Sequence, residues 1–357
     1  MNRLVELVKA GQSVWIDYIE RDFVRNGGLR SLIEKGVTGL TSNPTIFQKA
    51  IEKGHVYDKD IETLKNKGHT AEKIFEELAV TDIRDAADLF LPVYEKSGGK
   101  DGYVSLEVDP ALAHKSEETH QEALRLYEKT DRKNLMIKIP ATAAGIPAIE
   151  KTIAAGVNVN VTLIFDLATY RRVAEAYMRG LENYTGKDIG KIASVASFFI
   201  SRIDKAIDPL LLRQGQEKLT GKVAIANARA AYAEFHYLVG QPQWQSLAKK
   251  GANVQRLLWA STSTKNPEYP DTYYVDNLVG RDTVNTLPPE TLEKFLDHGS
   301  IDHVLNKDDQ EAKEIVQQTS REKELDVYAR LQKEGVEAFY QSYSSVLESI
   351  DDKITGK

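Results

Sequence analysis

Short apolar segments alternate along this chain with longer segments in which apolar residues recur three and four positions apart. The short segments lie near residues 13–17, 37–42, 102–108, 134–139, 157–165, 192–199, 255–261 and 283–287. Between them, helical periodicity covers residues 70–96, 111–129, 144–155, 166–184 and 221–239. Strands that alternate with helices indicate a parallel sheet. Eight such strands favour a closed (β/α)₈ TIM barrel over an open sheet, with additional helices at the N- and C-terminal ends.

The chain contains no obvious boundary between domains. It has 357 residues, and barrels of this class often exceed about 250 residues as a single unit. No linker rich in Pro, Gly or Ser divides it. We therefore predict one barrel domain over residues 1–357, with a long C-terminal helix at about 322–350.

The third, fourth and fifth predicted strands each have an apolar face and a polar face. The polar faces carry Ser105, Glu107 and Asp109, then Met136 and Lys138, then Asn158, Asn160 and Thr162. Because successive side chains alternate across a strand, the apolar faces can pack under helices while the polar faces converge inside the barrel. These polar residues come late in their strands, toward the carboxyl ends where barrel enzymes have their active sites.

Lys138 is the most informative of these residues, because its strand is otherwise apolar. Burial disfavours the charged ammonium and so favours the neutral amine, which can attack a carbonyl carbon. A solvated surface lysine is the ordinary alternative. Glu107 and Asp109 are either carboxylates on a surface strand or groups that transfer protons beside the lysine. Asp17 is either the N-cap of a turn or a member of the same cavity.

Composition excludes several classes of function. The net charge is −6 and Lys and Arg form no block, which argues against a nucleic-acid partner. The absence of cysteine excludes disulfides, thiolate metal sites and a cysteine nucleophile. His298 and His303 flank Asp302, but a pair of this kind usually marks a loop, and we predict no metal site. No glycine-rich phosphate loop or dinucleotide fingerprint indicates a cofactor.

The chain carries no pattern typical of a membrane or secreted protein. Its N-terminal segment is interrupted by Glu6 and Lys9, so it lacks the apolar run of a secretory signal. No uncharged stretch reaches the roughly 18 residues of a membrane span. We expect a cytoplasmic protein that has no membrane partner.

Four segments resemble those of one enzyme family. The run Thr41-Ser42-Asn43-Pro44-Thr45 is compatible with a simple helix start, yet residues 39–47 resemble the signature of transaldolases. Residues 136–142 resemble the segment that holds the Schiff-base lysine of that family. Residues 158–165 and 194–202 resemble two further segments. The four occur in the family's order, and the resemblance covers about the first 290 residues.

The resemblance implies a fold and a set of roles. Transaldolases are (β/α)₈ barrels whose lysine lies on the fourth strand, where Lys138 falls in this chain. By motif, Asp17 resembles the general acid/base, Glu107 the carboxylate that works through a water, and Thr162 the hydroxyl that holds this water. The groups that resemble those positioning the lysine and a dihydroxyacetone unit are Thr41, Asn43, Asn160 and Ser197.

The phosphate ligands are the part in which the chain departs from its relatives. Arg202 and Ser261 resemble two of the family's ligands. Many members have an arginine two residues after the serine, whereas this chain has Lys265 after a longer gap. A lysine binds phosphate as a point charge rather than as a fork, so we expect Lys265 to be the replacement. This variant resembles the longer bacterial branch of the family.

The resemblance also implies the reaction. It is the transaldolase reaction of the pentose phosphate pathway, in which a dihydroxyacetone unit passes between sedoheptulose 7-phosphate or fructose 6-phosphate and glyceraldehyde 3-phosphate or erythrose 4-phosphate. The expected partners are small sugar phosphates, without metal or cofactor, in a monomer or a homodimer. Two alternatives remain open: a Schiff-base aldolase acting on a related sugar phosphate, and a non-catalytic phosphosugar-binding barrel. The presence of Lys138, Glu107 and Asp17 together favours an enzyme.

Overall fold

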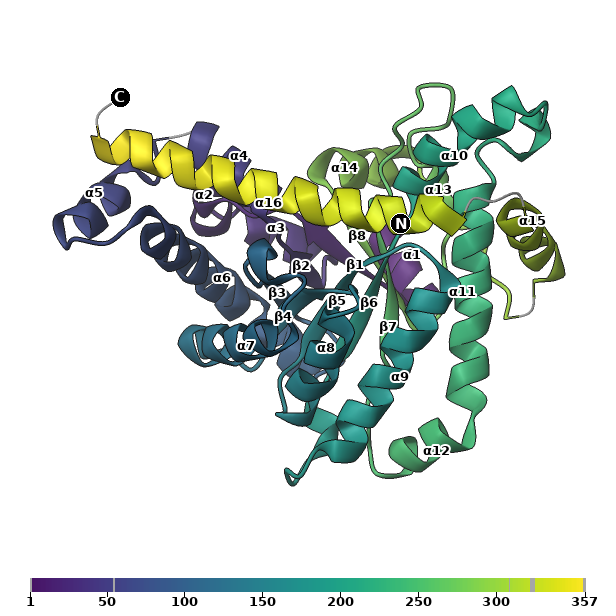
Figure 1. The fold of residues 1–357 in the computed structure, drawn as a ribbon, viewed down its shortest axis with the longest axis horizontal. Helices are drawn as coiled ribbons and strands as arrows, with labels where there is room; N and C mark the ends of the chain where they lie inside the picture. The colour runs from purple at the N-terminus through teal and green to yellow at the C-terminus, as the bar shows by residue number, and fades with distance from the viewer. Residues whose placement is uncertain (1, 54, 308, 322–324, 356–357) are drawn as a thin grey trace.

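The computed structural model describes residues 2–53, 55–307, 309–321 and 325–355. Eight parallel strands form a closed barrel in chain order, which confirms the predicted TIM barrel (Figure 1). The strands are β1 (Gln12–Asp17), β2 (Gly39–Thr41), β3 (Val104–Glu107), β4 (Leu135–Pro140), β5 (Val159–Ile164), β6 (Ser194–Phe199), β7 (Arg256–Ala260) and β8 (Thr283–Leu287). Each falls within or beside one of the eight segments predicted from alternation.

Helices connect the strands and surround the barrel. Those in the first half are α1 (Arg3–Ala10), α2 (Arg21–Arg25), α3 (Gly28–Lys35), α4 (Pro44–Lys53), α5 (Asp58–Asn66), α6 (Ala71–Lys96), α7 (Ser116–Thr130) and α8 (Gly145–Ala154). Those in the second half are α9 (Leu167–Asn183), α10 (Ser201–Arg213), α11 (Val223–Gly240), α12 (Pro242–Lys249), α13 (Tyr273–Asp276), α14 (Pro289–His298), α15 (Gln310–Arg321) and α16 (Leu325–Thr355). Within the described residues, no helix is long and apolar enough to cross a membrane.

One predicted helix consists of two pieces. The periodicity of residues 111–129 predicts one helix, but the structure has a short 3₁₀ turn, η1 (Pro110–Leu112), followed by α7. The Asp109 carboxylate accepts a hydrogen bond of 2.8 Å from the Ala111 N–H and so caps the turn. Lys115 then has an extended backbone, which interrupts the helical conformation, and α7 begins at Ser116. Apolar spacing runs through both pieces and therefore does not reveal the break.

The first two strands show how small residues set the barrel's packing. Trp15 on β1 pairs with Gly39 on β2 and is fully buried. A Cβ at residue 39 would lie 2.5 Å from Cε2 of the Trp15 indole, so only glycine fits beside this ring. The close approach brings the carboxyl ends of the two strands together, where Asp17 pairs with Thr41.

The helix α16 lies across the carboxyl ends of the strands, and Figure 1 shows it as the long yellow helix. Gln332 donates hydrogen bonds to the Ala141 carbonyl at 3.0 Å and to the Leu163 carbonyl at 3.1 Å, at the ends of β4 and β5. Gly335 lets the helix approach, because a Cβ there would lie 2.7 Å from a Leu163 methyl. The C-terminal helix predicted at about 322–350 corresponds to α16, and residues 322–324 lie outside the described residues.

Candidate active site

Strand register places three polar side chains at one level of the barrel. Glu107 on β3 pairs with Lys138 on β4, and Lys138 pairs with Asn160 on β5. Neighbouring strands lie about 4.8 Å apart, so paired residues of the same parity point into the same space. The three residues therefore form one row across the inside of the barrel, as the alternation of their strands predicts.

Lys138 lies at the centre of the row and is largely shielded from solvent. Its Nζ is 3.2 Å from Oε2 of Glu107 and donates to the carbonyl of Ser42, also at 3.2 Å. The lysine and glutamate side chains are each 6 % exposed. The ring of Phe339, from α16, lies over the amine with its centroid 5.2 Å from Nζ. The amine is thus held between a carboxylate and a carbonyl, under an aromatic cover.

Glu107 is the carboxylate of this pair, and its burial determines its proton affinity. Desolvation raises the pKa of Glu107, and the charge of Lys138 opposes this change. A carboxyl group with a raised pKa is a better general acid near neutral pH than an exposed one. The position of Glu107 beside the amine therefore suits proton transfer to and from groups on Lys138.

Asp17 and Thr41 form a second group at the ends of β1 and β2. The Thr41 hydroxyl donates to Oδ1 of Asp17 at 2.6 Å. A hydroxyl has one proton, so the 2.7 Å contact between Thr41 and Thr286 requires the Thr286 hydroxyl to donate. Burial raises the pKa of Asp17, while the nearby charge of Lys138 and the Thr41 hydrogen bond lower it. This chain of hydroxyls fixes the orientation of the carboxylate toward the barrel interior.

Asn160 links three strands. Its Nδ2 donates to the Ser105 hydroxyl at 3.0 Å, and its Oδ1 accepts from the Ser197 hydroxyl at 2.7 Å. Thr162 lies two residues after Asn160 on β5 and is also fully buried. Its hydroxyl has no hydrogen-bond partner among the described residues. A buried hydroxyl without a protein partner is a suitable site for an ordered water.

The far side of the barrel mouth contains the cations. Arg202 lies in the first turn of α10, and its guanidinium is 5.0 Å from the centroid of the Phe199 ring. Burial lowers the pKa of Arg202. Ser261 follows β7 in a left-handed backbone conformation (φ 57°), and its carbonyl accepts from the Ser201 N–H at 3.0 Å. This bond joins the end of β7 to the start of α10.

Lys265 approaches the same region from an exposed loop. Desolvation of its ammonium lowers the pKa of Lys265, and the neighbouring charge of Arg202 lowers it further. Its Nζ donates to the Ser263 hydroxyl at 2.8 Å. Two cations that repel each other gain from a shared anion, so the placement of Arg202 and Lys265 suits a phosphate group.

The structure assigns Asn43 a local role as well. Its Oδ1 accepts from the Ile46 N–H at 3.0 Å, so it caps the start of α4. The lysine instead contacts the carbonyl of the preceding residue, Ser42. Asn43 lines a neighbouring cavity, and among the described residues its side chain makes no hydrogen bond to Glu107, Lys138 or Asn160. The helix-start interpretation of this motif is confirmed by the cap, and the binding role of Asn43 stays a prediction.

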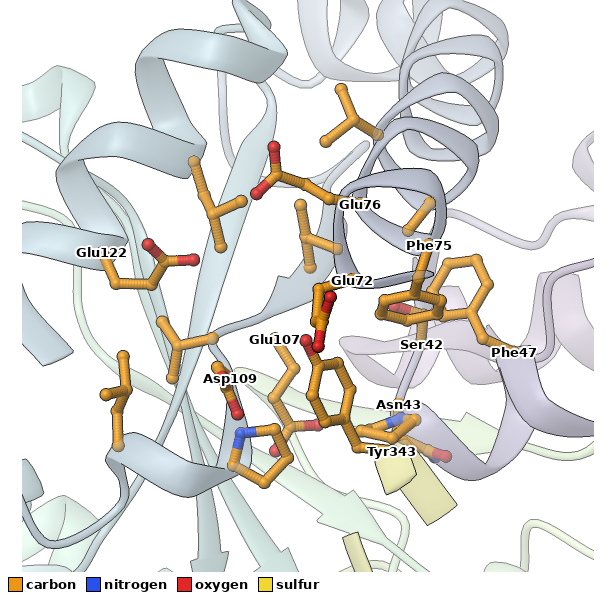
Figure 2. Close-up of a pocket in the computed structure, with 18 of the residues that line it drawn as sticks. Ser42, Asn43, Phe47, Glu72, Phe75, Glu76, Glu107, Asp109, Glu122 and Tyr343 are labelled. Carbon is orange, nitrogen blue, oxygen red and sulfur yellow. The ribbon is translucent and has the colours of Figure 1, made fainter. Parts of the chain in front are cut away.

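A cavity of about 370 Å³ opens outside the barrel, between α4, α6, α7 and α16. Figure 2 shows Glu107 beside Asn43 and Tyr343, with Glu76 and Glu122 farther out along the cavity. Asp109 also lines this cavity, but β3 ends at Glu107 and Asp109 caps η1, so the predicted strand face shared by the two carboxylates is wrong. The Glu107 carboxylate thus borders both the barrel interior and an outer cavity.

Several contributors to the site were not identified from the sequence. Ser42 supplies a carbonyl to the lysine, Ser105 and Thr286 complete hydroxyl networks, and Phe339 covers the amine. Alternation places Ser105 on the polar face of the third predicted strand but assigns it no role, and Thr286 lies on an inward strand face that the same alternation could have indicated. Phe339 is about 200 residues from Lys138 and lies on an amphipathic helix, whose pattern does not reveal what it covers.

His298, one of the two histidines considered as a metal pair, has a carboxylate partner. Nε2 of His298 lies 2.8 Å from Oδ1 of Asp271. In the part of the chain that the structure describes, three or more His, Cys, Asp or Glu side chains nowhere gather with the geometry of a metal site.

Comparisons with known proteins agree with this geometry. A family profile described as transaldolase/fructose-6-phosphate aldolase matches residues 14–350. "Transaldolase 2" of a Nostoc species is 45% identical over 99% of this chain and 98% of its own length. "Transaldolase" of a Parafrankia species is 45% identical over 98% of both chains. "Transaldolase" of Mycobacterium bovis is 44% identical over 97% of this chain and 95% of its own.

These matches extend over the barrel and α16 alike, and they confirm the resemblance found in the four sequence segments. The buried lysine lies on the fourth strand of an eight-stranded barrel, with a carboxylate on the third. The chain belongs to the transaldolase/fructose-6-phosphate aldolase family.

Proposed function

We propose that this enzyme is a transaldolase of the pentose phosphate pathway in which Lys138 carries a dihydroxyacetone unit as a Schiff base. The observation that carries the proposal is the Lys138 amine, which is held 3.2 Å from Glu107 Oε2 and 3.2 Å from the Ser42 carbonyl. The full-length similarity to proteins named transaldolase supports the substrate class.

Covalent catalysis begins at the C2 carbonyl of a ketose phosphate. The neutral amine of Lys138 attacks C2, and loss of water from the carbinolamine gives an iminium. Asp17 then removes the proton of the C4 hydroxyl, the C3–C4 bond breaks, and its electrons pass to the iminium. The aldehyde leaves and a three-carbon enamine stays on Lys138. Attack of this enamine on an acceptor aldehyde, with a proton returned from Asp17, reverses these events.

Glu107 and Thr162 are placed to handle the water of iminium formation and hydrolysis. The raised pKa of Glu107 favours a carboxyl that can donate a proton to the departing hydroxyl and accept it again. The unpaired Thr162 hydroxyl can hold the water between them. Asn160 and Ser197, together with Thr41, supply hydrogen bonds for the hydroxyls of the three-carbon unit.

Transfer rather than release requires the enamine to survive until an acceptor arrives. Phe339 and the helix α16 cover Lys138, which limits the access of bulk water. Arg202, Lys265 and Ser261 offer an anion site for the phosphate of donor and acceptor alike. These features favour a transaldolase over an aldolase that releases dihydroxyacetone.

Borohydride trapping tests the proposal directly. Reduction of the enzyme in the presence of fructose 6-phosphate should leave a three-carbon adduct on the peptide that contains Lys138. Adding erythrose 4-phosphate should discharge the enamine and prevent the adduct. An adduct on another lysine, or none, would contradict the mechanism. Accumulation of free dihydroxyacetone at the same rate with and without acceptor would instead identify an aldolase.

A cytoplasmic location remains a prediction from the sequence, as does the choice between monomer and homodimer. Sugar-phosphate donors and acceptors of this kind are intracellular metabolites, which supports the location. Size-exclusion chromatography with light scattering would determine the oligomeric state.

A further inference from the structure

The loop of residues 261–272 carries Ser261 and Lys265, and its first two residues are bonded to the barrel mouth. The Ser261 carbonyl accepts from the Ser201 N–H at 3.0 Å, and the Thr262 hydroxyl donates to Oδ1 of Asn285 at 2.9 Å. The bonds of the next residues stay within the loop. The Lys265 ammonium donates to Ser263, within the loop. The Thr264 hydroxyl donates to the Pro270 carbonyl at 2.9 Å, which is again internal. Both bonds shape the loop without fixing its distance from Arg202. Contacts farther along the loop than Thr262 must therefore hold Lys265 near Arg202 if the two cations are to bind one phosphate.

Two carboxylates on α10 make that contact. Asp208 accepts a hydrogen bond from the Tyr269 hydroxyl at 2.8 Å, and Asp204 accepts one from the Tyr274 hydroxyl at 3.0 Å. The two aspartates are four residues apart, so they lie on one face of the helix. Arg202 precedes Asp204 by two residues on the same helix. The tyrosine bonds therefore tie the end of the Lys265 loop to the helix that carries Arg202.

The remaining carboxylate oxygens anchor the same helix to the start of α11. Oδ1 of Asp204 accepts from the Ala224 N–H at 2.8 Å, and Oδ1 of Asp208 accepts from the Gly221 N–H at 3.0 Å. The Gly221 carbonyl in turn accepts from the Tyr273 hydroxyl at 3.1 Å. Each carboxylate thus accepts hydrogen bonds from two chain segments. The hydroxyls of Tyr269, Tyr273 and Tyr274 all donate within this network.

Gly221 shows that the network is sterically specified. It has φ +71°, and a Cβ there would lie 2.8 Å from Cζ of Tyr269. Any other residue would therefore be strained and would push the Tyr269 ring away from Asp208. The glycine supplies both the turn before α11 and the space that the tyrosine needs.

Burying the carboxyl groups of Asp204 and Asp208 costs folding free energy. Neither forms an ion pair with a described residue, and desolvation raises the pKa of both. Their acceptor oxygens are instead satisfied by hydroxyl and amide donors. Each aspartate side chain has two oxygens that accept hydrogen bonds, so it can hold an amide and a hydroxyl at once, and the arrangement gives a directional tether.

We propose that Asp208 and Asp204, acting through Tyr269 and Tyr274, are positioning residues that hold the Lys265 loop at the separation from Arg202 at which both cations bind the substrate phosphate. This proposal rests on the phosphate site of the proposed function. The four side chains act on Lys265 and Arg202 rather than on the sugar. They determine preference for phosphorylated over unphosphorylated ligands.

Tyr269→Phe removes one hydroxyl from this network and keeps the ring. The variant should raise KM for fructose 6-phosphate about tenfold, on the order expected for one lost hydrogen bond to a charged group, with kcat little changed. The inhibition constant of inorganic phosphate should rise by a similar factor. Borohydride trapping with unphosphorylated dihydroxyacetone should be unaffected. Asp208→Asn, which weakens the same bond from the other side, should give the same pattern.

Tyr177→Phe is the matched control. The Tyr177 hydroxyl also makes one buried bond, 2.7 Å to the Asn253 carbonyl, but on the approach to β7 rather than after it. This variant should lose comparable stability and leave both KM and phosphate inhibition unchanged. Equal changes in the two tyrosine variants would show a general effect of stability.

The double variant Tyr269→Phe/Lys265→Ala shows whether Tyr269 acts by positioning Lys265 or has an independent role in phosphate binding. If Tyr269 acts through Lys265, Tyr269→Phe should add little once the ammonium is absent. Fully additive effects, an unchanged KM in Tyr269→Phe, or an equal loss with dihydroxyacetone would overturn the proposal. Calorimetric binding of inorganic phosphate tests the loop without catalysis. An enzyme that binds phosphate through Tyr269 but forms no adduct would contradict the proposed function alone.

Discussion

The two ends of the candidate active site are built in different ways. At the proposed Schiff-base end, the paired strands β3, β4 and β5 place Glu107, Lys138 and Asn160 in one row. At the proposed phosphate end, Arg202 lies at a helix start and Lys265 on a loop that tyrosine–aspartate bonds hold from outside. The first end is fixed by the barrel's own hydrogen-bond ladder. The second depends on side chains that lie outside the barrel.

The proposed substrates explain why the ends should differ. All ketose donors place C2 at Lys138, so the groups that handle the carbonyl need one fixed geometry. The phosphate of a seven-carbon donor lies one carbon farther from C2 than that of a six-carbon donor. The tyrosine–aspartate bonds hold the backbone of the loop, but the long side chains of Arg202 and Lys265 can adjust to this difference by changing rotamer, whereas a strand cannot shift without disturbing its neighbours. Under this proposal, the chemistry lies on strands and the tolerance of substrate length lies on two cationic side chains.

The largest expected effect comes from removing the centre of the fixed end. Lys138→Ala should abolish both transfer and borohydride trapping, because no other amine occupies this row. The protein should keep its fold, because the buried Glu107 carboxyl, whose pKa desolvation raises, can take up a proton when its partner is removed. Circular dichroism and mass spectrometry of the reduced protein check both statements. Lys65→Ala, at an exposed position on α5, is the control. A persistent adduct in Lys138→Ala would identify another nucleophile.

The adjustable end should show a smaller and more selective loss. A charge-assisted contact to an anion contributes about 1.5–3 kcal/mol, so Arg202→Ala or Lys265→Ala should lower kcat/KM by roughly 10- to 150-fold for phosphorylated donors. Unphosphorylated fructose offers no anion and should be affected far less. Steady-state kinetics with both donors provide the test. Equal losses for the two donors in Lys265→Ala would remove Lys265 from the phosphate site and leave Arg202 and Ser261 to hold it.

The carboxylates behind the adjustable end should make stability depend on pH. Desolvation, together with the charge of Asp208, raises the pKa of Asp204 from 3.8 to about 7, and Tyr274 opposes this as a hydrogen-bond donor. Tyr269 and Tyr273 also face the two aspartates. The folded chain therefore holds a proton that the unfolded chain releases between these pH values. Its contribution to stability is complete below about pH 4 and is lost as pH rises to about 7.

Asp204→Asn removes this titration while keeping a side chain of the same shape. Relative to the native protein, the variant should gain stability as pH rises from 4 to 7, by at most about 4 kcal/mol. Urea denaturation at several pH values measures the difference. Asp17 and Glu107 titrate in both the native protein and Asp204→Asn, so their contributions cancel in the difference between the two stabilities. Parallel curves for the two proteins would show that Asp204 remains charged throughout.

The smallest expected effect is that of metal removal. The iminium on Lys138 itself accepts the electrons of the broken carbon–carbon bond, so the proposed reaction has no step that requires a cation. Prolonged treatment with EDTA should leave the transfer rate unchanged. A loss of activity that a divalent ion restores would count against Schiff-base chemistry on Lys138.

The same contrast explains what the sequence could predict. Alternation identifies the inward residues of β3 to β5, and parallel register then brings them together, so Glu107, Lys138 and Asn160 follow from local patterns. The barrel follows for the same reason. The catalytic and binding roles assigned to these residues, and the single-domain boundary at 1–357, remain predictions.

The rest depends on contacts that local patterns do not contain. The bond between Tyr269 and Asp208 joins residues 61 positions apart, and nothing about either residue alone indicates the other. Leu163 adopts a left-handed conformation at φ 60°, where the register between β5 and β6 shifts, so parity fails just beyond Thr162. Asn43 shows a third limit, because one motif serves both as a helix cap and as part of a site.

The position of α16 in the chain also sets an order of events during synthesis. The helix has 31 residues and follows all eight strands, so the ribosome completes the barrel before the segment that carries Phe339. At about 5–20 residues per second, α16 takes roughly 2–6 seconds to make. During this interval the strands can close while the Lys138 amine has no cover. The nascent enzyme therefore contains the proposed nucleophile, Lys138, before it contains the helix α16. Until α16 packs, nothing from that helix shields the amine from aldehydes in the cell.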